Sequence, residues 1–143
     1  MARRSRACVA FVGGWSGLAV DAEGKRFFSI SDAGSWMSGE IAYKGDQPVG
    51  IEGVRLGPIR AKSGEVLVRK RFSDAEGLTL ASGTPEQGTA LISFERKQRI
   101  GRFATDKGVL SPPARLHRAA CRRQEDEVQQ GTRSHRHHAR RAE

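Results

Sequence analysis

GWSGLAVDAEGKRFFSISD, at residues 14–32, contains two short apolar segments on either side of a polar turn. Residues 16–20 predict one strand, and Phe27, Phe28 and Ile30 predict a second. The DAEG sequence between them, at 21–24, begins with Asp and ends with Gly, which are favoured at those positions of a type I turn. The stretch therefore predicts a β-hairpin with buried strands.

A second stretch, DAEGLTLASGTPEQGTALISFE at residues 74–95, repeats this pattern. The Gly-Leu pair at 17–18 corresponds to the pair at 77–78, and the residues at 31–32 correspond to those at 94–95 after a slightly longer turn. Further strands are predicted at 36–45 and 48–57, joined at Gly45 and Asp46, and at 98–105, whereas 61–71 is interpreted as a loop.

Four short antiparallel strands in a unit that recurs are typical of β-propeller blades. We therefore predict an all-β fold with about two antiparallel blades of a β-propeller. A β-sandwich would fit the density of strands nearly as well, but it would not explain the repeat.

These stretches resemble the phytase-like family, described as having esterase-like activity of phytase. The resemblance is carried by FVGGWSGLAVD, FFSISDAGSW, VRLGPI, DAEGLTL and ISFERKQRIGRF, which follow one another over residues 11–113. It implies a bacterial β-propeller, of which this chain is an N-terminal fragment, and a hydrolase acting on a phosphoric or carboxylic ester of a small molecule. Intact relatives are expected to be exported or periplasmic, although the first 20 residues here do not form a convincing signal peptide.

Acidic residues recur at the predicted strand ends, which in a propeller approach the central channel. Several carboxylates there could hold Ca²⁺, which takes six to eight oxygen ligands, so calcium is the candidate cofactor of the intact family domain. Nearby arginines could contact a phosphate. The alternative is structural, with the aspartates capping turns and the others forming surface ion pairs. The candidate channel-lining acids and phosphate contacts are Asp32, Asp74, Glu76, Glu95, Arg96 and Arg99.

No catalytic residue is identified among these candidates. A serine nucleophile is not favoured, because the GWSGL sequence around Ser16 lacks the Gly-x-Ser-x-Gly spacing of a nucleophile elbow.

The net charge of +9 is concentrated at the two ends of the chain. Residues 11–113 carry 14 basic and 12 acidic residues, whereas 114–143 carry eight arginines against four acids. We therefore divide the chain into a non-native leader (1–10), a partial phytase-like domain (11–113) and an Arg/His-rich tail (114–143) expected to be disordered or marginally helical. No apolar run approaches the roughly 20 residues of a membrane span.

The tail allows a second interpretation, a non-catalytic basic protein that binds polyanions. Nucleic acid is not an expected partner, because the tail lacks both lysine and aromatic residues. His135, His137 and His138 lack the spacing of a structural zinc site.

A frameshift explains the tail better. Reverse translation of 114–143 with permitted codons, displaced by one base, reads RGYIALPAAAKKMKSNKGLEAIAI, which contains a further Gly-Leu opening. The same operation on residues 1–9 gives WRGGLVLA, a plausible strand. Both ends are therefore predicted to be out of frame, and the fragment is predicted to be inactive.

Overall fold

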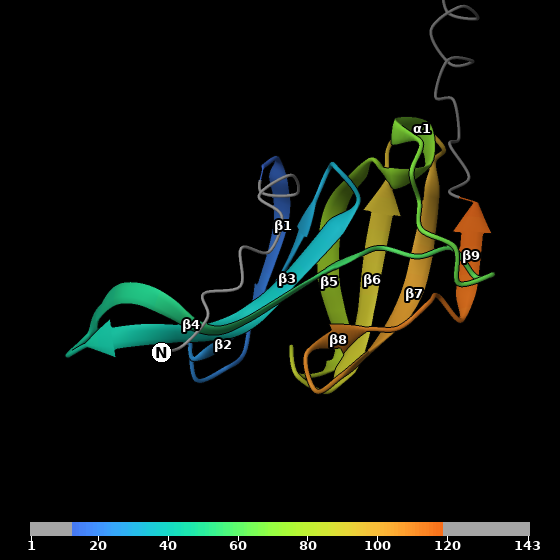
Figure 1. The fold of residues 1–143 in the computed structure, drawn as a ribbon. Helices are drawn as coiled ribbons and strands as arrows, with labels where there is room; N and C mark the ends of the chain where they lie inside the picture. The colour runs from blue at the N-terminus through green and yellow to red at the C-terminus, as the bar shows by residue number, and fades with distance from the viewer. Residues whose placement is uncertain (1–12, 119–143) are drawn as a thin grey trace, which may run out of the picture.

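A computed structural model describes residues 13–118 as two antiparallel sheets (Figure 1). The elements are β1 (Trp15–Val20), β2 (Arg26–Ser31), β3 (Ser35–Lys44), β4 (Gln47–Pro58), α1 (Lys70–Ser73), β5 (Ala75–Gly83), β6 (Gly88–Phe94), β7 (Arg99–Asp106), β8 (Val109–Leu110) and β9 (Arg115–Arg118). The predicted all-β class is confirmed.

The first sheet has the order β1-β2-β3-β4, so each strand pairs with its neighbour in the sequence. The hairpin predicted from residues 14–32 is present as β1 and β2. Its turn is closed by the Gly24 amide, which donates to the Asp21 carbonyl at 3.0 Å, the hydrogen bond from i+3 to i that is common in β-turns. The predicted reversal at Gly45 is also present, and its φ of 62° is one that glycine adopts without strain.

The second sheet begins with β5, β6 and β7, after which β7 pairs with both β8 and β9. The strand predicted at 98–105 is therefore confirmed as β7. Strand β9 was not predicted: it takes the first residues of the basic tail into the sheet, because the backbone of 115–118 pairs with β7. The rest of the tail and the leader lie outside the described residues.

The sequence repeat corresponds to a structural repeat. The first strand of each sheet has a register irregularity at the same place, between Trp15 and Gly17 in β1 and between Ala75 and Gly77 in β5. Such bulges redirect a strand and its side chains. Ser16 and Glu76 therefore occupy equivalent positions at the start of the two sheets.

The core lies between the two sheets. Side chains alternate across a strand, so Phe28, Ile30 and Trp36 lie on one side of the first sheet, where the Phe28 and Trp36 rings stack at 5.8 Å. The second sheet completes the cluster. Its buried hydrophobic residues are Ala75, Ala90, Ile92, Phe94, Phe103 and Leu110.

The two sheets approach one another most closely at their first strands, β1 and β5. A Cβ atom on Gly17 would lie 2.7 Å from the Leu78 Cβ and 3.2 Å from the Leu78 amide nitrogen. Ser16 also donates from its Oγ to the Ala75 carbonyl. The absence of a side chain at position 17 therefore sets the distance between the sheets.

The opposite side of the first sheet is only partly covered: Phe27 and Ser29 on this side are buried, whereas several apolar side chains are open to solvent. Cross-strand pairing through Ser29 puts Leu18, Met37 and Leu56 in one row. Leu18 is 64% and Leu56 48% exposed. Ile51 is 51% exposed and pairs with Ile41. We call this surface the open face of the first sheet.

A long connection runs from β4, at the far edge of the first sheet, to β5, next to β1 (Figure 1). Most of the segment 61–71 is irregular, as expected, apart from a bridge between Arg60 and Val66. The single turn of α1 begins at its end and brings Lys70 and Asp74 next to the end of β2. Within residues 13–118, no helix is long and apolar enough to cross a membrane.

Candidate functional site

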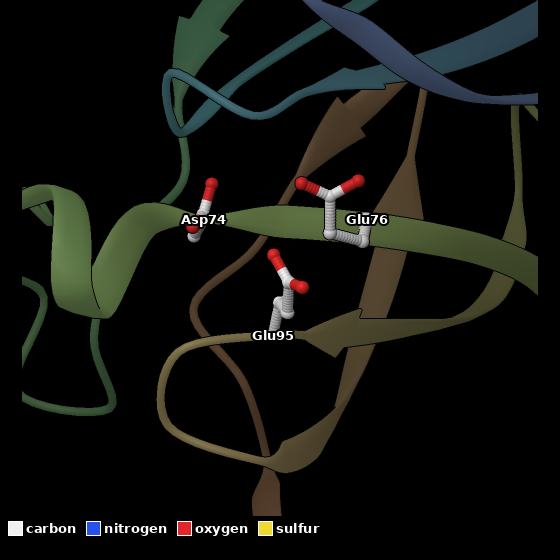
Figure 2. A group of neighbouring side chains, drawn as sticks. All are labelled: Asp74, Glu76 and Glu95. Atoms are coloured by element: carbon white, nitrogen blue, oxygen red, sulfur yellow. The ribbon is translucent and has the colours of Figure 1, made fainter.

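Three carboxylates gather where β5 begins and β6 ends (Figure 2). One oxygen from each of Asp74, Glu76 and Glu95 lies within 4.8 Å of the others. Asp74 follows α1, Glu76 lies at the bulge of β5, and Glu95 follows β6. The Glu95 amide donates to the Asp74 carbonyl at 3.0 Å, which holds the two segments together.

Asp74 is the buried member of this cluster, with a side chain only 5% exposed. Its Oδ1 lies 3.0 Å from the Lys70 Nζ, and its Oδ2 accepts from the Arg96 Nε at 2.9 Å. A buried carboxylate requires such pairing. The hydrogen bond from Lys70, and secondarily the one from Arg96, lowers the pKa of Asp74 from its ordinary value, against the opposing effect of desolvation.

Lys70 connects the two sheets through its ammonium group. The Nζ lies 2.7 Å from the Asp32 Oδ2, just after β2, while it also contacts Asp74 before β5. The hydrogen bonds to Asp32 and then to Asp74 raise the pKa of Lys70 above its ordinary value. The two repeats therefore share one cation between equivalent ends of their sheets.

The structure brings five of the six candidate residues into one network. Asp32 and Asp74 share Lys70, Arg96 binds Asp74, and Glu76 and Glu95 complete the carboxylate cluster. The sixth candidate, Arg99, has different contacts. Its guanidinium lies over the Phe94 ring at 4.1 Å and donates to the Phe72 carbonyl.

Lys70 is the member of the network that the sequence does not indicate, because the pattern of 61–71 predicts a loop. Its spacing from Asp74 is i,i+4, which is a recognisable ion-pair signal only within a helix. The single turn of α1 supplies that helix, but it is too short for a hydrophobic period to reveal it.

The carboxylates do not form a complete calcium site among the described residues. Both Asp74 oxygens already contact cations, so Glu76 and Glu95 are left to supply at most four oxygens. Calcium takes six to eight. Calcium binding by this cluster would therefore need further ligands.

Replacing Lys70 with methionine should raise the pKa of Asp74. The reason is that the largest favourable contact of the ionised carboxylate is removed while Arg96 remains. Carboxyl-detected NMR titration would measure the change. Lys62→Met, which removes an exposed loop lysine, is the matched control and should leave that pKa unchanged.

The pH dependence of stability follows from the signs of the two shifts. Asp74 has a lowered pKa, so its contribution is present above the ordinary value of 3.8 and is lost as the pH falls through the folded value. Lys70 has a raised pKa, so its contribution is present below 10.5 and is lost as the pH rises through the folded value. The stability difference between the native chain and Lys70→Met should therefore be largest from about pH 5 to 9. A difference that stays constant down to pH 2 would contradict this assignment.

Two antiparallel sheets with equivalent bulges, and a charged network at their shared end, define an all-β repeat protein. Comparison with known families gives a match to the phytase-like family, described as esterase-like activity of phytase, over residues 10–138. The chain belongs to this family, as the sequence resemblance predicted. No curated protein and no solved structure matches the chain.

Proposed function

We propose that the chain contributes part of the site of a hydrolase that cleaves a phosphoric or carboxylic ester of a small molecule. Membership of the phytase-like family supports the reaction class. The site assignment rests on the carboxylate cluster, whose residues come from both ends of the β5–β6 hairpin. Next to it lies the Lys70 ammonium group, which contacts Asp32 of the first sheet and Asp74 of the second.

Within the carboxylate cluster, Glu76 and Glu95 have the carboxylates available for chemistry. Both are exposed, whereas Asp74 is buried and doubly paired. An exposed carboxylate can accept a proton from a water molecule that attacks the ester. Arg96 binds Asp74 through its Nε and is 59% exposed, so its terminal N–H groups are suited to a phosphate or a developing oxyanion. Asp74 then acts as a positioning residue for Arg96.

We infer further that the two sheets are successive blades of a β-propeller. In each sheet, the strands from β1 to β4 and from β5 to β8 pair with their neighbours in the sequence. The connection then returns from the outer strand β4 to β5, so that β5 lies beside β1 and the first strands of the two sheets are in contact. Blades in a propeller are arranged in this way around a channel. The open face of the first sheet, with Leu18, Ile51 and Leu56 exposed, would be covered by another blade.

On this proposal, the site in residues 1–143 is incomplete and the chain alone is inactive. The family match continues to residue 138 and therefore includes most of the tail that sequence analysis predicts to be out of frame. The nucleotide sequence around codon 113 would resolve the matter. We expect an open frame, displaced by one base, that encodes further Gly-Leu hairpins, and a frame interrupted by stops would refute the frameshift.

Hydrolysis assays would test the function. Residues 1–143 should release no 4-nitrophenol above background from 4-nitrophenyl phosphate or 4-nitrophenyl acetate. The version with the frame restored should be active, and Glu95→Gln in it should lower kcat by about 100-fold, the lower end of the usual contribution of a general base. Glu52→Gln, at an exposed position in β4, is the matched control. Turnover by 1–143 that Glu95→Gln abolishes would show that the site is already complete.

A further inference from the structure

A cavity that shares no residue with the carboxylate cluster lies between the β4–β5 connection and the second sheet. It has a volume of about 240 Å³. Its walls are apolar, with Leu67 and Phe72 from the connection and Phe94, Phe103 and Leu116 from β6, β7 and β9. A drug-sized ligand needs about 300 Å³ or more, so this cavity fits a smaller molecule. Three phenylalanine rings favour a flat aromatic one.

Three cationic residues also line this cavity, namely Arg60, Lys97 and Arg99, and none of its lining residues within 13–118 is acidic. The Lys97 Nζ lies 4.7 Å from the centre of the Phe72 ring, and the Arg99 guanidinium lies over Phe94. The surface exposed inside the cavity is almost entirely apolar, so the charged ends of these three side chains lie at its border. A ligand with an aromatic body inside the cavity and an anionic group at its mouth would complement this arrangement.

Arg99 is the cation best placed to recognise that anionic group. It is half-buried, and it donates to the carbonyls of Phe72 and, at 3.4 Å, of Lys97. A guanidinium has five N–H donors, so others remain for a ligand. Partial burial of the Arg99 guanidinium lowers its pKa from the ordinary value. A bound carboxylate would offset the cost of this burial.

We propose that this cavity is a binding site for a small aromatic carboxylate. The aromatic body would occupy the space between Phe72, Phe94 and Phe103, and the carboxylate would pair with Arg99 beside Lys97 and Arg60. The proposal does not depend on hydrolase activity, because it concerns binding alone.

Titration of the full chain with 2-naphthoate, followed by protein-detected NMR, would test the proposal. We expect a Kd on the order of 0.1–1 mM for so small a ligand, with shifts centred on Phe103 and Leu116. Naphthalene-2-carboxamide has the same shape without the charge and should bind about tenfold more weakly. Acetate, which lacks the aromatic body, should produce no saturable shifts.

Variants of the cations provide the matched comparison. Arg99→Gln should weaken naphthoate binding about tenfold, whereas Arg102→Gln should not change it. Arg102 has the same charge and lies on the same strand, but its side chain points to the opposite side of the sheet from Arg99 and Phe103.

If Arg99→Gln fails to fold, the double variant Arg60→Gln/Lys97→Gln, at two exposed positions, should still weaken binding about fivefold. Equal affinities for the acid and the amide, no binding at about 10 mM, or an equal effect of Arg102→Gln would overturn the proposal.

Discussion

Replacing Phe28 with alanine is expected to destabilise the fold by about 3–5 kcal/mol, the usual cost of removing a large buried aromatic side chain. Phe28 is fully buried between the sheets and stacks on Trp36. Its removal leaves a cavity that the neighbouring strands of β2 cannot fill without breaking their pairing. Small domains have only about 5–15 kcal/mol of stability, so a large part of the margin would be lost.

Urea denaturation followed by tryptophan fluorescence would measure this loss. Leu18→Ala is the matched control, because Leu18 lies on the open face of the same sheet and is 64% exposed. It should change the free energy of unfolding by less than about 0.5 kcal/mol. Equal effects of the two substitutions would mean that the core does not lie between the sheets.

Gly17→Val should separate the two sheets and destabilise the fold by about 1–3 kcal/mol, the usual cost of overpacking. A Cβ atom there would overlap Leu78, whose backbone nitrogen cannot move independently of β5. Because Asp74 directly precedes β5 and Glu76 lies within it, the substitution should also disturb the carboxylate cluster. Amide chemical shifts would report both effects.

Gly50→Ala is the control for this second substitution. Gly50 lies on the exposed strand β4, and a Cβ atom there would meet no other atom within 4 Å. We expect it to leave both the stability and the shifts of Asp74 unchanged. If Gly17→Val behaved in the same way, β1 and β5 would not be in direct contact in solution.

Much of the fold could be predicted from local sequence. The turn at 21–24, the reversal at Gly45 and the alternating strands depend on residues close in the chain, and the structure confirms them. Strand β9 could not be predicted, because its pattern is polar and its pairing with β7 comes from backbone hydrogen bonds. Propensity alone favoured helix or disorder for that segment.

The candidate site was predictable as a set of acids but not as a network. Strand ends can be located from the sequence, so Asp32 and Glu95 were identified as candidates at equivalent positions. The role of Lys70 depends on how the connection folds back over the sheets, and no local pattern encodes that path. The same limit applies to Arg99, whose side of the sheet is decided by the register of β7.

The pairing of β1 to β8, each with its neighbour in the sequence inside its own sheet, has a consequence for synthesis on the ribosome. Each hairpin joins neighbouring residues and can form within about 1–10 μs, whereas contact between the sheets joins residues about 60 positions apart, such as Gly17 and Leu78. At about 5–20 residues per second, translation leaves the first sheet without its partner for several seconds. During that interval the inner surface around Phe28 and Trp36 is exposed in the nascent chain. We therefore expect chaperones to engage the chain after Pro58 has emerged and to release it once β7 is complete.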